Sequence, residues 1–440
     1  ASEIDGLGQN SFRIFDTTIK RKGGVCMKSN YTDYKVSNRN TIGLFILISV
    51  ILLYPDSITG FLTYIPQLIV GFIALYSMTK VSILKPVKTF LAFALYMTIM
   101  NIILSTMNSS KGILEILTSS LRLYYPFLGL IIGCWFRKKI KPESFLNVLV
   151  FFLALQFAVS FLQINNDGFR IWSYTLYRPS NLEYYLGAFS WATGRRAIGT
   201  VANPNLLGML IVVLNSSILI LSELHTKKRF FKIVSVLCTI ASLYVCLYTQ
   251  SRTALLIWVS ATALIVYWKF PQKGIVKVFY LCISVIGGVL LLSYLQDRIS
   301  REISFSALDS RFNIWSLRVS QMFEKARYEN FFASILGVGF TTARRFGTFD
   351  NSYVKYFVAG GVIGLLAFIG TILSAAKTFF KRASQDIWRR LGLVIMFVWL
   401  LGSMVAEYQE MFKLSIMSFI ILGYAMYSIK PMKNTAEKNG

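Results

Sequence analysis

The recurrence of long apolar segments constrains this chain more than any other feature. Apolar runs, most of them about 20 residues long, follow one another almost from end to end of the 440 residues. A helix of roughly 20 residues crosses a hydrocarbon core about 30 Å thick. Only 15% of the residues are charged, against about 25% in soluble domains. The sequence therefore predicts an all-α, polytopic integral membrane protein, and it excludes a chain of soluble domains.

Apolar runs bounded by charged residues or proline predict about twelve transmembrane helices. They cover residues 41–54, 61–79, 88–107, 113–136, 144–164, 203–224, 231–249, 252–268, 275–295, 353–380, 391–408 and 411–429. The chain then divides into a cytoplasmic N-terminal segment, a transmembrane domain and a cytoplasmic tail, at residues 1–40, 41–429 and 430–440.

The distribution of basic residues predicts the orientation. The segment before the first span and the connections after every second span hold 21 Lys and 8 Arg, counted with the adjoining span ends. This excess places both termini in the cytoplasm and accounts for the net charge of +26 without a nucleic-acid partner. The remaining chain holds 4 Lys and 13 Arg. Arginine there either packs better in folded loops or grips planar acceptors such as phosphate.

Two predicted external connections are long, residues 165–202 and 296–352, and long loops in a minimal bundle are usually functional. At the other end of the chain, Met27 followed by Lys28 is a candidate natural start. Residues 1–26 would then be non-native, so they are left out of the functional argument.

The second long connection contains a predicted helix over residues 311–330 that lies along the membrane surface. Its apolar residues recur at helical spacing: Phe312, Trp315, Val319, Met322 and Phe323. Arg311, Arg318 and Lys325 recur every seven residues and therefore share one face. This stripe either binds phosphate groups or is a solvated face balanced by acidic residues.

Three predicted spans start at the external face, where free amide groups and the positive dipole end favour anions. In "RRAIGTVANPNLLG", Asn203 suits the N-cap and Pro204 the first helical position. In "TQSRTALL", Arg252 lies in the first turn behind a Ser251 cap. A cation there opposes the helix dipole, which favours a functional role for Arg252.

The third start, "FDNSYVKYFVAGGVIG", offers Asp350 either as the helix cap or as a proton acceptor in a cavity. Its glycines, Gly360, Gly361 and Gly364, allow close helix packing. Arg122 lies about ten residues, or roughly 15 Å, below the external edge at about 1.5 Å per residue. An arginine at that depth must pair or line a cavity.

Elimination narrows the possible chemistry. The single histidine, His225, falls in a predicted cytoplasmic connection, so external chemistry uses Asp, Glu, Arg, Tyr or Asn. A P-loop, GxSxG, HExxH and CxxC are all absent from the sequence. The predicted external acids show no paired-carboxylate spacing typical of a metal site. We therefore predict neither a metal nor a cofactor.

Four segments in order resemble the bacterial O-antigen polymerase and ligase superfamily. They are "RRAIGTVANPNLLGMLI" at 195–211, "CLYTQSRTALLIWV" at 246–259, "DSRFNIWSL" at 309–317 and "LGVGF…FDNSYVKYFVAGGVIGLLAFI" at 336–369. The resemblance implies a metal-independent, inverting glycosyltransferase of the GT-C type in the bacterial inner membrane, with its active site facing the periplasm. The Asp-Asn pair at 350–351, where ligases have His-Asn, is similar to Wzy-type polymerases.

The resemblance implies that Arg252 and Arg311 bind pyrophosphate and that Asp350 occupies the base position. Because fixed guanidinium groups can neutralise a leaving diphosphate, the chemistry of these residue types agrees with that assignment. We therefore predict Asp350, Arg252 and Arg311 as catalytic residues. Predicted substrate-binding residues are Arg196, Asn205, Arg122, Arg318 and Asn351.

The resemblance implies transfer of a glycan from undecaprenyl pyrophosphate to the terminal sugar of a second lipid-linked repeat unit. Its implied partners are undecaprenyl pyrophosphate-linked oligosaccharide, membrane lipid, a chain-length regulator of the Wzz type and a flippase of the Wzx type. Two other functions stay open: an O-antigen ligase acting on a lipid A core, and a flippase or transporter of lipid-linked oligosaccharide.

Overall fold

A computed structural model describes residues 38–108, 113–178, 196–225, 228–269, 306–328, 332–380 and 386–429. All regular secondary structure in these ranges is helical. Eight helical stretches are long and apolar enough to cross a membrane, and Asn38–Leu53 and Arg252–Trp268 are shorter apolar helices. The chain is thus all-helical with the character of a membrane protein, as predicted. The predicted span at 275–295 lies outside the described ranges.

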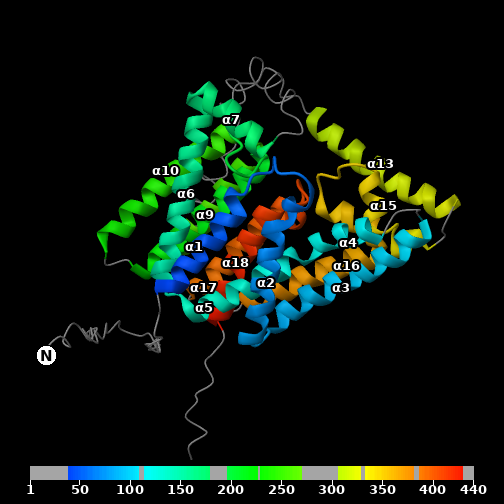
Figure 1. Ribbon diagram of the computed structural model, residues 1–440, viewed down its shortest axis with the longest axis horizontal. Coiled ribbons are helices and arrows are strands. Elements are labelled where there is room, and N and C mark those ends of the chain that lie inside the picture. The colour runs from blue at the N-terminus through cyan, green and yellow to red at the C-terminus, as the bar shows by residue number, and fades with distance from the viewer. Residues whose placement is uncertain are drawn as a thin grey trace, which may run out of the picture. The chain divides into compact units, whose positions relative to one another are not determined.

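The first half of the chain contains helices whose starts are often set by proline. Proline occupies one of the first two helical positions in α2, α5 and α6, where its missing N–H removes no intrahelical bond. The elements are α1 (Asn38–Leu53), η1 (Gly60–Tyr64), α2 (Ile65–Lys80), α3 (Lys85–Asn108), α4 (Ile113–Leu121), η2 (Arg122–Tyr124), α5 (Tyr125–Lys139), α6 (Pro142–Asn165) and α7 (Asp167–Tyr177) (Figure 1).

The second half supplies the helix starts singled out in the sequence. Its elements are α9 (Pro204–Leu221), η4 (Ser222–His225), α10 (Arg229–Thr249), α11 (Arg252–Lys269), α13 (Ser306–Tyr328), α14 (Ala333–Leu336), α15 (Phe340–Arg345), α16 (Ser352–Phe380), α17 (Ile387–Ser403), η5 (Tyr408–Glu410) and α18 (Phe412–Ile429). The span predicted at 391–408 is wrong at its end. The chain leaves the helix after Ser403 and forms η5, which carries the buried Glu410.

Two helices at the centre approach each other closely through glycines. A Cβ on Gly133 of α5 would lie 2.1 Å from the Ile420 carbonyl oxygen of α18, and one on Gly423 would lie 2.2 Å from the Leu130 carbonyl oxygen. Figure 1 shows α18 and α5 in the same part of the bundle. Helix α9 packs against α6, α10, α11 and α17 and is buried along nearly its whole length. These contacts hold the start of α9 near the starts of α11 and α18.

Helix α16 is kinked at Gly361, which has φ 62° and ψ −160°. The backbone after α14 runs beside the kink, where the N–H groups of Val338 and Gly339 donate to the carbonyls of Val358 and Ala359, each at 3.0 Å. A Cβ on Gly361 would lie 2.0 Å from the Ile335 carbonyl oxygen. Close packing at Gly361 is therefore with this neighbouring segment, whereas Gly360 and Gly364 pack against Met97 of α3 as expected for helix packing.

The two long connections predicted to be external contain helices. Helix α7 lies in the first, whose residues 179–195 are outside the described ranges. The helix predicted over 311–330 is present as α13. Its apolar residues differ in burial: Met322 is buried, whereas Phe312 and Phe323 are exposed.

Candidate functional site

Three helix starts are each preceded by a residue in the left-handed backbone region. Ala202 has φ 66°, Gln250 has φ 52° and Asp350 has φ 47°, and these are the non-glycine residues with positive φ in the described chain. They lie directly before the capping residues of α9, α11 and α16. A non-glycine residue in this region costs roughly 1–3 kcal/mol and is frequent at functional sites. The three strained turns coincide with the three starts that the sequence singled out.

The predicted caps of α9 and α11 are confirmed. Asn203 Oδ1 accepts from the N–H of Asn205 at 2.9 Å and from that of Leu206 at 3.4 Å. Ser251 Oγ accepts from the N–H of Ala254 at 3.3 Å. Arg252 therefore begins α11 in the first turn, and it is exposed.

The cap of α16 is Asn351 and not Asp350. Asn351 Oδ1 accepts from the N–H of Tyr353 at 2.9 Å and from that of Val354 at 3.1 Å. The Asp350 carboxylate forms no hydrogen bond or ion pair with the described residues. Two neighbouring residues with side-chain oxygens can both cap a helix, and the left-handed turn at Asp350 aligns only the second with the free amides. The capping alternative for Asp350 is therefore wrong.

Arg311 lies within electrostatic range of Asp350. Burial raises the pKa of Asp350 above its usual value of 3.8, Arg311 opposes that shift, and Glu407 adds to it. The carboxylate thus holds its proton more tightly than an exposed aspartate, within electrostatic range of a guanidinium group. A carboxylate with a raised pKa is a better general base than an exposed one, and here it has a cationic partner nearby.

Helix α13 presents its basic stripe to the turn that precedes Asp350. Trp315 Nε1 donates to the Phe349 carbonyl at 2.8 Å. A Cβ on Gly347, at φ 107°, would lie 2.5 Å from Arg318 Nη2, so Arg318 covers this glycine. The prediction that Arg311 and Arg318 share one face is confirmed, because both approach the same short turn.

Phe349 fixes the position of Asp350 from the other side. Its ring is fully buried, and its N–H donates to Glu407 Oε1 at 3.1 Å. Glu407 is itself ion-paired with Lys355, whose Nζ also lies 2.6 Å from Glu410 Oε2. We refer to Asp350, Arg311, Arg318 and Glu407 as the Asp350 group.

Glu407, Glu410 and Lys355 were not predicted as site residues. Glu407 lies at the end of the span predicted at 391–408 and Glu410 in the short connection after it, and only the charged spacing in "EYQEMFK" gave a signal. Burial raises the pKa of Glu410 to about 7, with Lys355 opposing the shift. The ion pairs join residues 52 and 55 positions apart, so their existence depends on the tertiary fold.

Arg122 reaches the same charged region from within a predicted span. The span predicted at 113–136 lies in one helical stretch, Ile113–Lys139, which contains a 3-10 turn, η2, that begins at Arg122. Arg122 interacts electrostatically with Glu410 and with Arg344, another residue that the sequence analysis missed. Burial, together with repulsion from Arg122, lowers the pKa of Arg344. The two guanidinium groups therefore lie close enough to repel each other, and the carboxylates of Glu410, Glu407 and Glu115 offset this repulsion at Arg344.

Arg196 and Asn205 form a second cluster with the turn before Arg252. Arg196 Nε donates to the Thr249 carbonyl at 2.8 Å, and Nη2 donates to Asn205 Oδ1 at 3.4 Å. We refer to Arg252, Arg196 and Asn205 as the Arg252 group. In the described chain, no hydrogen bond or ion pair joins Arg252 to Asp350 or Arg311. The predicted site residues are thus gathered into two groups.

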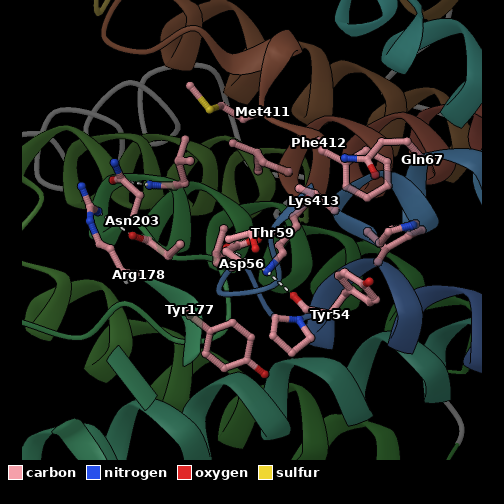
Figure 2. A pocket seen from close by; sticks show the side chains of 18 residues that line it. Tyr54, Asp56, Thr59, Gln67, Tyr177, Arg178, Asn203, Met411, Phe412 and Lys413 are labelled. Carbon is pink, nitrogen blue, oxygen red and sulfur yellow. Dashed lines mark hydrogen bonds and ion pairs between the residues drawn. The ribbon is translucent and has the colours of Figure 1, made fainter. Parts of the chain in front are cut away.

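A cavity of about 680 Å³ is lined by residues adjacent in sequence to the Arg252 group and to Glu410 (Figure 2). Ala202 and Asn203 on its wall precede Asn205, and Met411 and Phe412 follow Glu410. The cavity therefore lies beside the turn before α9 and beside the start of α18.

Comparisons with known proteins do not assign this chain to a family. The chain matches no known family model. No curated protein is significantly similar to it in sequence.

Proposed function

We propose that this chain is a membrane glycosyltransferase that polymerises lipid-linked polysaccharide repeat units. It moves a glycan from undecaprenyl pyrophosphate to the terminal sugar of another lipid-linked repeat unit at the periplasmic face of the bacterial inner membrane. One observation carries the proposal: Asp350, which does not cap α16, lies within electrostatic range of Arg311 on a turn held by Phe349.

The reaction assigns a separate task to each side chain. The acceptor hydroxyl oxygen attacks the anomeric carbon, and Asp350 takes the hydroxyl proton. The bond from that carbon to the diphosphate oxygen breaks, and its electron pair leaves with the diphosphate. Arg311 and Arg318 neutralise the charge that develops there, a role in which fixed donors are most effective. The proposed enzyme is metal-independent and of the GT-C type.

Two arginine groups suit two diphosphate-linked substrates. The Asp350 group, helped by Arg122 and Arg344, takes the diphosphate that leaves. The Arg252 group takes the diphosphate that stays on the acceptor lipid, where Arg196 and the start of α9 supply donors. In this proposal the chain spans the membrane twelve times, with both termini in the cytoplasm, and the excess of Arg at the external face serves both diphosphates.

A transporter of lipid-linked oligosaccharide is the second candidate, because the structure contains an interrupted helix near a buried charged residue. Helix α16 is kinked at Gly361 a short distance after the buried Lys355. Interrupted helices with charges are typical of secondary transporters. The Asp350–Arg311 relationship favours the transferase, since transport needs no base beside the cation.

A reconstituted assay separates these functions. Purified full-length protein in vesicles receives only undecaprenyl-linked repeat units, and products are separated by glycan length. A polymerase forms a ladder without lipid A core, whereas a ligase needs the core and a transporter moves substrate without changing its length. We expect Asp350→Asn and Arg311→Ala to abolish the ladder and Glu324→Ala, at an exposed position of α13, to leave it intact.

A further inference from the structure

The 680 Å³ cavity lies among helix ends, of which the proposed chemistry uses only the start of α9. The loop after α1 supplies Tyr54, Asp56 and Thr59, α7 ends beside it with Tyr177, and the starts of α9 and α18 complete the wall. Figure 2 shows Asn203 and Arg178 at one end of the cavity and Tyr54 and Gln67 at the other. Its size falls within the range of small-molecule sites, about 300–1,000 Å³.

The two basic residues on the wall are already engaged by the protein. Lys413 Nζ donates to the Thr200 carbonyl at 2.7 Å and to the Tyr54 carbonyl at 3.0 Å, and lies 3.2 Å from Asp56 Oδ2. An ammonium group has three protons to donate, so Lys413 has none left for a ligand. Arg178 Nη1 donates to the Ala202 carbonyl. Because Lys413 has no free proton and Asp56 is itself an anion, this part of the wall does not suit a diphosphate.

The polar groups that remain available on the wall include both hydrogen-bond donors and acceptors. Asp56 Oδ1 is an acceptor, Asn203 Nδ2 is a donor and the Thr59 hydroxyl can act as either, and none has a hydrogen-bond partner in the described chain. Between them stand apolar surfaces, including the rings of Tyr177 and Phe412. A sugar ring has the complementary character, with hydroxyl groups at its rim and C–H groups on its faces. A lipid tail would leave the polar groups unsatisfied, which costs free energy.

The cavity adjoins the Arg252 group at one end. Asn203 on its wall caps the helix that carries Asn205. At the other side, Met411 and Phe412 on the wall directly follow the buried Glu410. A ligand in the cavity would therefore lie beside the Arg252 group and next to the segment that carries Glu410.

We propose that this cavity binds an uncharged stretch of glycan through Asp56, Asn203 and Thr59. Its role as the subsite for the acceptor repeat unit rests on the proposed function, whereas glycan binding itself does not.

Binding of a free repeat unit tests the proposal without any transfer. The probe is the oligosaccharide released by mild acid from the host's own undecaprenyl-linked repeat unit, and the readout is saturation-transfer NMR on detergent-solubilised full-length protein. Asn203→Asp keeps the capping oxygen but removes the amide donor, and Thr59→Trp fills the opening. We expect each to weaken binding about tenfold or more. Phe61→Trp, at an exposed residue outside the cavity wall, is the matched control and should bind normally.

The outcomes separate this proposal from the proposed function. Unchanged binding in Asn203→Asp and Thr59→Trp, absence of binding to the wild type, or displacement of the glycan by inorganic pyrophosphate would each overturn the glycan site. Binding that needs these residues, in a protein that forms no polymer from lipid-linked units, would refute the polymerase and leave the glycan site standing.

Discussion

The Phe349 N–H donates to Glu407 Oε1 at 3.1 Å, and this bond ties the turn before Asp350 to an acid 58 residues further along the chain. Trp315 Nε1 donates to the Phe349 carbonyl, so both backbone polar groups of Phe349 are hydrogen bonded. Asp350 thereby keeps its left-handed conformation without a hydrogen bond from its carboxylate to any residue that the structure describes.

Glu407 is therefore expected to position Asp350. Glu407→Ala leaves a Phe349 N–H without its acceptor, at a cost of about 1–3 kcal/mol. We predict a fall in kcat of tenfold or more with little change in KM for the lipid-linked substrate, and partial rescue in Glu407→Gln, which retains an acceptor. Steady-state kinetics of the three proteins measure this. Equal loss of activity in the Ala and Gln variants would show that the charge matters and the hydrogen bond does not.

The fall in activity at low pH, the acid limb of the pH–rate profile, should follow the protonation of the Asp350 carboxyl group. A base acts only when deprotonated, and burial raises the pKa of this carboxyl above 3.8, so activity is lost as pH falls through that raised value. Because Arg311 lowers the pKa and Glu407 raises it, Arg311→Lys should leave the limb nearly unchanged, whereas Glu407→Gln should move it to lower pH. A pH–rate profile of the residual activity checks both directions. A limb that Glu407→Gln moves to higher pH would contradict the assignment.

Glu410 should make stability depend on pH in the opposite sense to a salt-bridged surface acid. Burial raises its pKa from 4.5 to about 7, so the folded protein binds an extra proton between these values. Its contribution is most favourable below about pH 4.5 and is lost as pH rises through about 7. Thermal unfolding of wild type and Glu410→Gln is measured from pH 5 to 8. The unfolding temperature of the variant should rise relative to that of the wild type as pH rises. A constant difference would mean that Glu410 does not titrate in this range.

Parts of the site are readable from sequence because they are local. The Asn203 and Ser251 caps and the heptad spacing of Arg311 and Arg318 depend only on neighbouring residues, and the structure reproduces them. The cap of α16 was predicted at Asp350, but Asn351 caps the helix, because the left-handed backbone at Asp350 brings only the next side chain to the free amides. The ion pairs of Lys355 could not be predicted, because distant segments must first fold together.

The same limit applies to the glycines of α16. Sequence spacing predicts close helix packing, and Gly360 and Gly364 have it, but the kink at Gly361 depends on the segment after α14. The 3-10 turn at Arg122 likewise lies within one continuous apolar run, so hydropathy does not reveal it. Helix existence follows from hydropathy, whereas interruptions follow from contacts with other parts of the chain.

The kink can be tested with a matched pair of glycine substitutions. Gly361→Ala puts a Cβ 2.0 Å from a backbone oxygen at a positive φ, so it should destabilise the protein by about 3 kcal/mol or more. Gly370→Ala lies in the same helix with no atom within 4 Å of its Cβ and should be neutral or stabilise by up to about 1 kcal/mol. Thermal unfolding in detergent compares them. Similar unfolding temperatures for the two variants would mean that the kink is not needed.

A double-mutant cycle on Asp350 and Arg311 tests the central claim most directly. The rate measured is the release of undecaprenyl pyrophosphate from lipid-linked repeat units by wild type, Asp350→Asn, Arg311→Ala and the double variant. We predict that each single change lowers kcat by about 10²-fold or more and that the double variant is hardly slower than the worse single one, because base and cation act on one transition state. Wild-type release by either single variant, or strictly additive losses, would contradict the account.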